Sequence, residues 1–402
     1  MAGITHGGGL TAACARYGGE PKDWLDLSTG INPNMVALPE IPEAVWNRLP
    51  DKALERAARE AARDWYLSAA GSPPSVLPDI SPSRGEIDQT QAHHSEANVE
   101  NIADLGWIGA SGAPLLISPL EGEMPGRAEG GDAEQNHVSG NLPLPVPGTQ
   151  SFIQILPKLI PADRPVAILS PTYGEYAHCF RRAGMTVDAI GSLDELTGDH
   201  GALVIVNPNN PTGGTFLRRE LTGLAARMRK QGGHLHIDEA FGDARPELSL
   251  AALAGETGGV TVSRSFGKFF GLAGLRLGFV FAVPEALETI EAELGPWAVS
   301  GPALYLANEL MRGDRKRILS DIQARQAALA SVLHAAELET VGGTELFALV
   351  RHNRAQDLFE HLARLHILVR KFDYAGDWLR IGLAPDEQGD RRLAQALASI
   401  RD

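Results

Sequence analysis

The sequence of 402 residues predicts an α/β fold with a mainly parallel sheet in a large domain and a smaller α/β domain beside it. Two observations support this prediction. Between about residues 142 and 280, short apolar runs alternate with helical patterns, and turn residues separate them, as in a parallel sheet that helices cover on both faces. After Pro284, helical patterns precede two further apolar runs, 346–350 and 367–370, which we interpret as strands of the smaller domain.

The composition excludes several classes of protein. A net charge of −14 argues against nucleic acids and anionic membranes as partners. No apolar run approaches the ~18 residues that a membrane-spanning helix needs, and the first residues lack the basic start and apolar stretch of a signal peptide. The two cysteines, Cys14 and Cys179, suit neither a disulfide framework nor a zinc site, so we expect a cytoplasmic protein with no metal site.

The chain divides into three predicted parts. Residues 1–50 are irregular and rich in Gly, Pro and Asn, and we assign them to an N-terminal arm and part of the small domain. Residues 51–283 form the large domain and residues 284–402 the C-terminal small domain. A helix is expected over 51–66, capped by Asp51, with one apolar face made of Ala53, Leu54, Ala57, Ala58, Ala61 and Trp65.

Residues 72–141 interrupt the large domain. They lack sustained periodicity and are dense in Ser, Pro, Gly and acidic residues, a composition typical of a disordered, solvated segment. A structureless stretch of this length is unusual within a compact domain. We therefore interpret it as a selectively neutral insertion, with a lid or docking segment as the functional alternative.

The segment 263–278 is the most informative for chemistry. It places Lys268 among hydroxyls and small residues, with Arg276 eight positions on. An amine so placed can bond covalently to an aldehyde cofactor, while Ser265 and Arg276 hold the phosphate of that cofactor. A lone lysine is usually a solvated surface charge, so the interpretation depends on other segments to supply the remaining contacts.

Four other segments supply those contacts. Asp238 ends an apolar run that we interpret as a buried strand, and its carboxylate can keep a pyridine nitrogen protonated. Asn210 and Tyr173 each follow another such run, and they can hydrogen-bond a ring hydroxyl and stack on a ring, respectively. The segment 147–151 precedes a helical pattern, where free N–H groups make an anion site.

In this order the five segments resemble the fold-type I pyridoxal-phosphate enzymes, the aspartate aminotransferase superfamily, over nearly the whole chain except about residues 72–141. The resemblance implies the cofactor pyridoxal 5′-phosphate, bound covalently by Lys268. It also implies that Asp238 pairs with the pyridine nitrogen, Asn210 with the phenolic oxygen, and that Tyr173 stacks on the ring. The residues that it assigns to the cofactor phosphate are Gly148, Thr149, Gln150, Ser263, Ser265 and Arg276.

Arg380 lies in the segment 378–384, Trp-Leu-Arg-Ile-Gly-Leu-Ala. It matches the arginine that binds the substrate α-carboxylate in this superfamily, a role that suits a guanidinium because its fork matches two carboxylate oxygens. The superfamily builds each site across a two-fold interface, so the resemblance also implies a homodimer.

The N-terminal segments distinguish between branches of the superfamily. His-Gly-Gly at 6–8 and Asp-Leu-Ser-Thr-Gly-Ile-Asn-Pro at 26–33 are similar to the threonine-phosphate decarboxylases of cobalamin biosynthesis. By this resemblance His6 and Asn32 would help to bind the substrate phosphate, and Arg370 would add a cation nearby. The alternatives are a flexible arm for the first segment and a plain turn for the second.

Three residues depart from the usual pattern of the superfamily. Phe241 stands where many members have a Tyr that hydrogen-bonds the ring oxygen. Leu49 replaces a Tyr that in many relatives reaches the cofactor phosphate of the partner subunit. Gly267 replaces a common Ser before the lysine. None of the three removes a group that the chemistry requires.

The resemblance therefore implies a pyridoxal-phosphate-dependent decarboxylase that converts L-threonine O-3-phosphate to (R)-1-amino-2-propanol O-2-phosphate in cobalamin biosynthesis. One alternative is an aminotransferase of the histidinol-phosphate type. An alternative of another class is a non-catalytic cofactor-binding protein, inactivated by the insertion at 72–141. The partner expected in each enzymatic case is a small phosphorylated amino-acid substrate.

Overall fold

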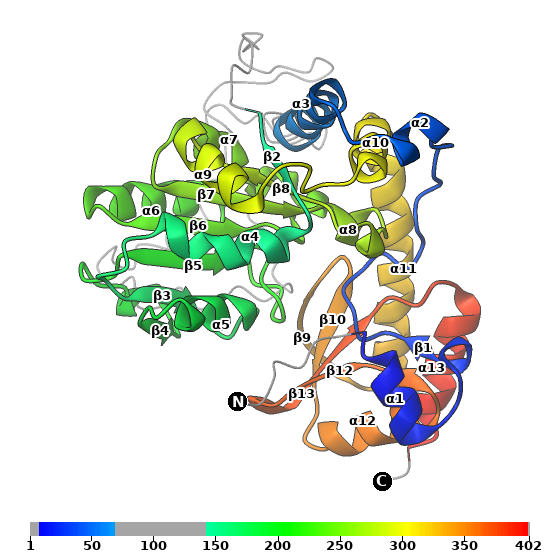
Figure 1. Cartoon of the computed structure of the whole chain (residues 1–402). Coiled ribbons are helices and arrows are strands. Elements are labelled where there is room, and N and C mark those ends of the chain that lie inside the picture. Colours follow the sequence, from blue (N-terminus) through cyan, green and yellow to red (C-terminus); the bar gives the residue numbers. More distant parts are fainter. Residues whose placement is uncertain (1–7, 69–141, 401–402) are drawn as a thin grey trace, which may run out of the picture.

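The computed structural model describes residues 8–68 and 142–400, and these residues form the α/β fold predicted from the sequence (Figure 1). The larger sheet has seven strands in the order β2-β8-β7-β6-β5-β3-β4. Neighbouring strands are parallel except at β8, which is antiparallel to both β2 and β7. In sheet order the strands span Leu144–Val146, Gly278–Phe281, Val260–Ser265, His234–Asp238, Ala202–Val206, Val166–Leu169 and Val187–Ile190.

Helices cover both faces of this sheet, which explains why its central strands are buried along their whole length. Every residue of β5 and of β6 is buried. One face packs against α4, α5 and α9, and the other against α3, α6 and α7. These helices span Thr149–Ile155, Glu175–Arg182, Pro284–Leu294, Lys52–Ser68, Arg218–Lys230 and Ala251–Glu256.

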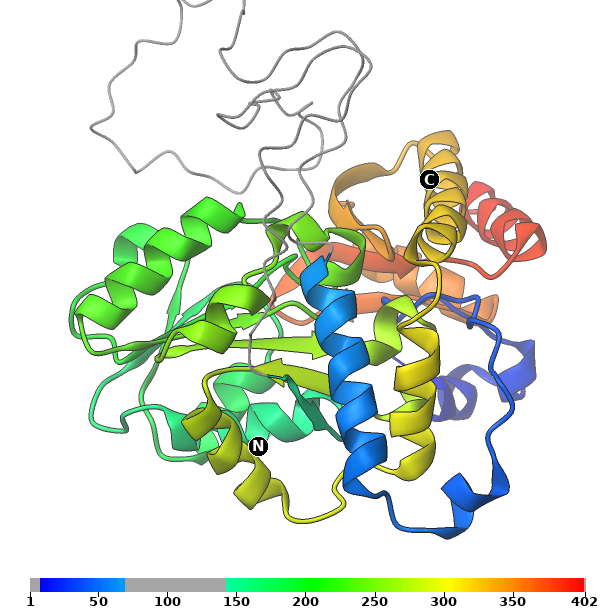
Figure 2. The same ribbon diagram turned by 90° about the horizontal axis from the view of Figure 1, so that it is seen from above.

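Helix α3 confirms the first predicted helix and its cap, because the carboxylate of Asp51 accepts a hydrogen bond of 2.8 Å from the backbone N–H of Leu54. Figure 2 shows α3 beside α10, Gly301–Leu310. The predicted face is wrong at Ala53, which is exposed, because Ala53 lies off the i, i+3, i+4 stripe of the buried residues. That stripe is made of Ala58, Ala61, Ala62, Trp65 and Tyr66.

The C-terminal part contains a four-stranded antiparallel sheet in the order β12-β13-β10-β9. The long helix α11 runs from the larger sheet down to this smaller one (Figure 1). The strands span Arg370–Phe372, Ala375–Gly382, Phe347–Arg351 and Glu339–Thr344. The helices α11, α12 and α13 span Arg315–Ala335, Ala355–Arg364 and Glu387–Ala398.

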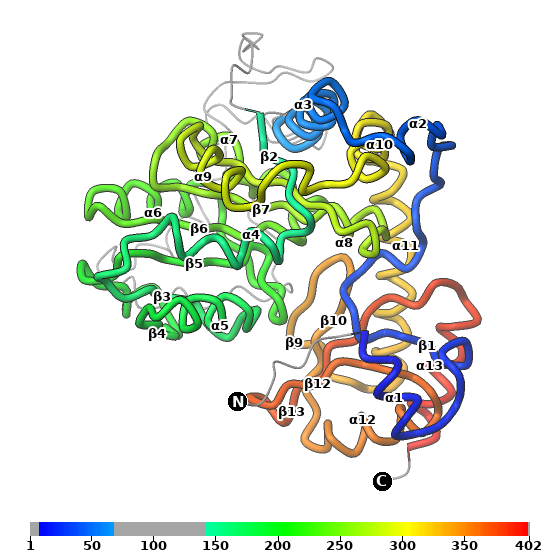
Figure 3. The backbone as a smooth tube through the Cα atoms, in the orientation of Figure 1, coloured from blue at the N-terminus to red at the C-terminus, as the bar shows by residue number. Residues whose placement is uncertain are grey.

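The N-terminal segment belongs to the same part of the molecule as the C-terminal sheet. Strand β1, Leu25–Asp26, pairs in parallel with β11, Ile367–Leu368, so that residues more than three hundred positions apart lie side by side (Figure 3). The prediction that the first fifty residues are irregular is wrong for part of the described segment, because α1, Leu10–Tyr17, and α2, Glu43–Asn47, are helical. The three alanines of α1 are good helix formers, a signal that outweighs the glycines before it.

The two sheets meet where the backbone of the loop after β5 touches the backbone of strand β9. The backbone N–H of Gly343 donates to the carbonyl of Thr212 at 3.1 Å. Gly213 has φ +73°, and a Cβ atom there would lie 1.7 Å from the carbonyl oxygen of Gly343. Only glycine fits at these positions, since a side chain would overlap the opposite backbone. The loop after β5 is therefore held directly against the β9–β10 hairpin.

No helix within residues 8–68 and 142–400 is long and apolar enough to cross a membrane. The predicted insertion at 72–141 lies outside the described residues, and its interpretation stays a prediction. The chain returns from it at Leu142 and Pro143, whose carbonyl oxygens accept hydrogen bonds of 3.0 and 3.1 Å from Arg59 of α3.

Candidate functional site

Most of the predicted site residues gather at the carboxyl ends of β5, β6 and β7. Asp238 is the last residue of β6 and Ser265 the last of β7, while Asn210 lies in the loop after β5. Lys268 follows on the short helix α8, Phe266–Phe269. The topology explains this gathering, because the carboxyl ends of parallel strands meet at one edge of the sheet.

Lys268 is partly accessible to solvent, yet loss of water around its ammonium group lowers its pKa from 10.5 to about 8. The positive charge of Arg380 contributes to this lowered pKa, and the negative charge of Asp238 opposes it. The amine lies 5.8 Å from the centre of the Phe241 ring. A lysine with this pKa carries a useful fraction of neutral, nucleophilic amine near neutral pH.

Asp238 is buried, and burial raises the pKa of its carboxyl group. Its two oxygens accept hydrogen bonds from the Tyr176 hydroxyl at 2.8 Å and from the backbone N–H of Ala240 at 2.9 Å. Both bonds stabilise the ionised form. Among the described residues no cation lies within ion-pair distance of this carboxylate, so its charge is left without a direct protein partner.

Asn210 and Arg380 are joined to each other. The guanidinium of Arg380 donates to the side-chain oxygen of Asn210, and also to the backbone carbonyl of Ser28 at 2.8 Å. A guanidinium has only donors, so it fixes the amide oxygen of Asn210 toward itself and turns the amide N–H₂ elsewhere. That leaves the N–H₂ group as a donor for a ring hydroxyl, which is the role predicted for Asn210.

Arg370 and Arg380 lie directly opposite each other on the antiparallel strands β12 and β13. Burial lowers the pKa of Arg380 from 12.5 to about 10, and the positive charge of Arg370 adds to this shift. The Nε atom of Arg380 is buried without a hydrogen-bond partner in the described part of the chain. Like charges directly across a strand pair are destabilising, so the arrangement favours an anionic ligand between the two arginines.

Tyr173 lies at the side of the site formed by the start of α4 and α5. Its hydroxyl donates to the side-chain oxygen of Gln150 at 3.2 Å, and the Gln150 amide donates to Glu175 at 2.6 Å. Burial raises the pKa of Tyr173 to about 12, so the phenol stays neutral. Its ring then offers an apolar face for stacking, while the hydroxyl forms hydrogen bonds. The hydrogen bonds hold the ring in one orientation, as stacking on a cofactor would require.

The predicted phosphate residues form a cradle at Gly148 and Arg276. Gly148 has φ +75°, and a Cβ atom there would lie 2.6 Å from the Arg276 guanidinium. A Cβ atom on Gly278 would similarly lie 3.1 Å from the backbone nitrogen of Thr149. Ser265 pairs with Gly278 in the β7–β8 register, which brings it to the same place. Backbone N–H groups, a hydroxyl and a guanidinium therefore converge where an anion would fit.

Ser263 lies further along β7, opposite Asp238 in the parallel register. Its hydroxyl lies near that of Tyr176, but it is buried and forms no hydrogen bond of normal geometry with any described residue. It therefore sits at the Asp238 end of the site, and its assignment to the phosphate stays a prediction.

Asn32 forms hydrogen bonds to backbone carbonyls of α8, the helix that carries Lys268. Its side-chain amide donates to the carbonyl of Phe269 at 3.0 Å, its side-chain oxygen accepts from Asn34, and its backbone N–H donates to the carbonyl of Lys268. It thus ties the N-terminal segment to α8, and one amide hydrogen remains for a ligand. Phosphate binding by Asn32 stays a prediction, and His6 lies outside the described residues.

The arrangement fits pyridoxal 5′-phosphate. Within residues 8–68 and 142–400, the buried hydroxyl of Ser263 and the buried Nε of Arg380 form no hydrogen bond of normal geometry, and no cation lies within ion-pair distance of Asp238. The close approach of Gly148 to Arg276 leaves no room for a side chain. A ring with a protonated nitrogen and a phosphate would complement these groups.

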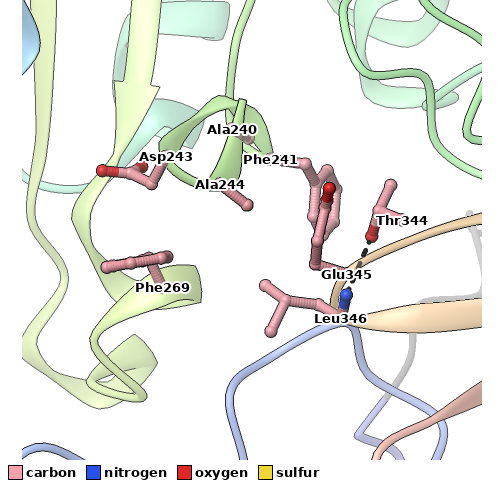
Figure 4. Close-up of a pocket in the computed structure, with 8 residues that line it drawn as sticks. All are labelled: Ala240, Phe241, Asp243, Ala244, Phe269, Thr344, Glu345 and Leu346. Atoms are coloured by element: carbon pink, nitrogen blue, oxygen red, sulfur yellow. Dashed lines mark hydrogen bonds between the residues drawn. The ribbon is translucent and has the colours of Figure 1, made fainter. Parts of the chain in front are cut away.

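A small pocket lies on the other side of Phe241, between the 240–244 turn and the β9–β10 hairpin (Figure 4). The N–H of Leu346 donates to the Thr344 hydroxyl at 3.1 Å on its hairpin wall, and burial raises the pKa of Glu345. Since Lys268 does not line it, this pocket is a gap between the two sheets and not the candidate site. It is lined by Ala240, Phe241, Asp243, Ala244, Phe269, Thr344, Glu345 and Leu346.

Residues 139–397 match the sequence family Aminotransferase class I and II. The chain belongs to this family. It is 48% identical over 397 residues to a threonine-phosphate decarboxylase of Sinorhizobium sp, covering 99% of this chain and 98% of the relative. It is 34% identical to a threonine-phosphate decarboxylase of Pseudomonas aeruginosa, covering 99% and 98%. Its fold is similar to that of the histidinol-phosphate aminotransferase of Clostridium acetobutylicum, with a TM-score of 0.63, 16% identity and coverage of 92% and 97%.

The predicted resemblance to the aminotransferase superfamily is confirmed, and the structure explains one of the three departures from its pattern. A Cβ atom on Gly267 would lie 2.6 Å from the Cα of Ala273, so a serine does not fit there. The ring of Phe241 packs edge-on against Phe347 with centroids 5.2 Å apart. Leu49 is 66% exposed, and nothing in the described residues explains it.

Sequence reasoning missed three residues of this aminotransferase-family site. Ser28 holds Arg380 through its backbone carbonyl, which no side-chain pattern indicates. Tyr176 and His236 lie behind Asp238. A signal for His236 was present, because residues two apart on a strand point to the same face, and His236 precedes Asp238 by two.

Proposed function

We propose that this protein is a pyridoxal-phosphate-dependent threonine-phosphate decarboxylase. It would convert L-threonine O-3-phosphate to (R)-1-amino-2-propanol O-2-phosphate, a step of cobalamin biosynthesis. The two relatives that match it over 99% of its length carry the name threonine-phosphate decarboxylase. The structural observation that carries the proposal is the pair of opposed arginines, Arg370 and Arg380, of which Arg380 lies close enough to Lys268 to lower its pKa.

The substrate carries two anions on adjacent carbons. Its carboxylate is on the α-carbon and its phosphate ester on the β-carbon. Cross-strand neighbours in an antiparallel pair have Cβ atoms about 5 Å apart, which suits two anions separated by so few bonds. Arg380, buried and close to Lys268, would take the carboxylate, and the half-buried Arg370 the phosphate.

The cofactor would be held by the residues that converge at the sheet edge. Gly148, Thr149, Ser265 and Arg276 would bind its phosphate, and Tyr173 would stack on its ring. When bound, pyridoxal 5′-phosphate supplies an electron-withdrawing ring that takes up the electron pair left when a bond at the substrate α-carbon breaks.

The chain's own residues would decide which bond breaks. Arg380 fixes the position of the carboxylate, and that position selects the bond to the carboxylate over the bond to hydrogen. Arg380 is itself fixed by Asn210 and Ser28, so its orientation does not depend on the substrate. After carbon dioxide leaves, the ammonium form of Lys268, whose pKa is lowered to about 8, is suited to donate a proton to the α-carbon and to become the neutral amine.

The decisive assay measures carbon dioxide release from O-phospho-L-threonine by purified protein supplied with pyridoxal 5′-phosphate. Lys268→Ala should abolish both this release and the yellow colour of the bound cofactor. Histidinol phosphate with 2-oxoglutarate serves as the competing substrate pair. Turnover of that pair without release of carbon dioxide from O-phospho-L-threonine would establish the aminotransferase instead, and colour without any turnover would establish a non-catalytic binding protein.

We also propose a cytoplasmic homodimer. Several large apolar side chains are exposed on the described surface, which supports burial against a second copy. Cys14 and Cys179 are both free, which suits a reducing compartment. Light scattering of the purified protein would test the dimer. The exposed apolar residues that support it are Met35, Leu38, Trp46, Leu49 and Trp297.

A further inference from the structure

A chain of hydrogen bonds runs along β6 behind the proposed cofactor site. It starts at Asp238, passes through Tyr176 and His236, and ends through Thr261 at His234. The bond lengths in this order are 2.8 Å from Tyr176 to Asp238, 3.0 Å from Tyr176 to His236, 2.9 Å from His236 to Thr261 and 3.0 Å from Thr261 to His234. No step of the proposed reaction uses the last four residues.

Both histidines in this series of hydrogen bonds, His234 and His236, are neutral. Burial lowers the pKa of His236 to about 3 and that of His234 to about 4. Tyr176 is also neutral, because burial raises its pKa. Each neutral imidazole has one donor nitrogen and one acceptor nitrogen, and each hydroxyl has one hydrogen to donate. Two patterns therefore run in a single direction along all five residues, one toward Asp238 and one away from it.

The state of Asp238 selects between the two patterns. An ionised carboxylate only accepts, so the Tyr176 hydroxyl must donate to it. The Tyr176 oxygen then accepts from Nε2–H of His236, whose Nδ1 accepts from the hydroxyl of Thr261. Thr261 in turn accepts from Nε2–H of His234. Every donor then points toward Asp238, and hydrogen bonds aligned in one direction polarise and strengthen one another.

We propose that Tyr176 and His236 are positioning residues, which hold Asp238 ionised and oriented toward the ring nitrogen of the cofactor. This inference rests on the proposed pyridoxal-phosphate site. His236 acts only through Tyr176, because its own ring is completely buried and faces α5 and α4, with centroids 5.3 Å from Tyr176 and 5.4 Å from Phe152. The Ala240 N–H, which donates to the other oxygen of Asp238, adds to the same effect.

Two charged groups also act on Asp238. Lys268 favours its ionised form, and Glu239 disfavours it. The effect of both charges depends on distance and does not favour one orientation of the carboxylate. The hydrogen bond from Tyr176, in contrast, fixes the position of the oxygen atom that accepts it. The orientation of the carboxylate is therefore assigned to the hydrogen-bond chain and not to these charges.

The first test reads the tautomer of His236 directly. ¹⁵N NMR of the protein with labelled histidine, with the His236 signals assigned by their loss in His236→Gln, should show a proton on Nε2 and none on Nδ1. The reverse tautomer would overturn the proposal, because His236 would then accept from Tyr176. This measurement needs no substrate and is made on the protein with and without cofactor.

The second test separates an effect on the ring nitrogen from general damage. The dissociation constant for pyridoxal 5′-phosphate should rise roughly tenfold in His236→Leu, the loss expected when one hydrogen bond in a chain to a charged group is removed. With a cofactor analogue that has C–H in place of the ring nitrogen, wild type and variant should bind alike. An equal loss with both compounds would show that His236 is only structural.

Two further variants complete the test. His236→Gln keeps a donor near the position of Nε2 and should bind pyridoxal 5′-phosphate close to wild type. The matched control is His200→Leu, which removes another buried histidine, bonded to Thr197 and Asp188 away from the site. It should leave binding of both compounds unchanged. A wild type that binds no pyridoxal 5′-phosphate would instead refute the proposed function itself.

Discussion

Asp238 and Glu239 are neighbouring buried carboxylates on opposite faces of the sheet, and their surroundings differ in kind. Glu239 pairs with the guanidinium of Arg264 at 2.6 Å and accepts from the hydroxyl of Ser249 and the N–H of Leu250. Within the described part of the chain, the Asp238 carboxylate accepts hydrogen bonds only from the Tyr176 hydroxyl and the backbone N–H of Ala240. The protein neutralises the first charge internally and leaves the second to be neutralised by a ligand.

The region around Glu239 is a buried ion cluster that joins several elements. Arg264 also lies 3.4 Å from Asp243 and 4.4 Å from the Tyr66 ring centre, and the indole of Trp65 donates to Asp243 at 2.8 Å. The two nearby carboxylates raise the pKa of Arg264, so it stays charged despite burial. This region stabilises the contact between α3 and the sheet, whereas the region around Asp238 serves chemistry. The same residue type at adjacent positions thus has two separate uses.

Replacing the unpaired carboxylate should have the largest effect on activity and little on stability. Asp238→Asn should lower kcat/KM for decarboxylation by about 10²–10³-fold, the usual cost of removing one electrostatic contact to the transition state. The unfolding temperature of the cofactor-free protein should stay the same or rise, because an uncompensated buried charge is removed. A large fall in that temperature would show that Asp238 is structural and end the contrast with Glu239.

Removing the ion-pair partner of Glu239 should lower stability more than activity, which is the opposite of the effect expected at Asp238. Arg264→Met leaves Glu239 and Asp243 buried without their ion-pair partner, which should cost about 3–5 kcal/mol of the free energy of unfolding. Urea unfolding of the cofactor-free protein measures this loss. The double variant Arg264→Met with Glu239→Leu should recover part of it. If Arg264→Met unfolded like wild type but lost the bound cofactor, the cluster would belong to the site after all.

The pH dependence of covalent cofactor attachment to Lys268 should show a smaller effect, and it also distinguishes Asp238 from Glu239. Only the neutral amine of Lys268 attacks an aldehyde, and its pKa is lowered from 10.5 to about 8. The rate constant for covalent attachment should therefore rise with pH around a midpoint near 8, increasing roughly tenfold between pH 7 and 9. Stopped-flow absorbance of the cofactor-free protein measures it.

A paired control separates the two carboxylates in this experiment. The negative charge of Asp238 raises the pKa of Lys268, so Asp238→Asn should move the midpoint to lower pH. Glu239→Gln should leave the midpoint where it is, since Glu239 faces the other side of the sheet. A midpoint near 10.5 in the wild type would place Lys268 in bulk solvent.

Deletion of residues 72–141 should have the smallest effect. If the segment is a neutral insertion, joining the chain across it leaves kcat and KM for O-phospho-L-threonine unchanged within experimental error. Both carboxylate regions would also keep their effects in the shortened protein. A large loss of activity in a soluble, cofactor-binding deletion variant would favour the lid or docking segment.

Much of the fold and part of the site could be predicted from the sequence. Asp238, Asn210 and Tyr173 were predictable because each lies at or just after the carboxyl end of a predicted buried strand, and parallel strands bring their carboxyl ends together. The domain boundaries at residues 50 and 283 remain predictions. The pattern of apolar residues thus predicted the edge of the sheet at which the site residues lie.

The remaining residues depend on contacts between distant segments. Ser28 contributes only a carbonyl oxygen, which every residue has, so its bond to Arg380 leaves no trace in the sequence. Tyr176 lies on α5, and its bond to Asp238 depends on how that helix packs on β6. The prediction of α3 failed at Ala53 for a related reason, because the buried stripe follows the actual packing partners.

The contact of Gly213 with Gly343 has a consequence for how this protein can change over generations. Backbone meets backbone there, so the distance between the smaller sheet, which carries Arg370 and Arg380, and the carboxyl edge of the larger sheet is set without any side chain that substitution could adjust. A change in substrate preference would therefore need substitutions of the side chains that lie between the two sheets, while the distance between the sheets stays the same.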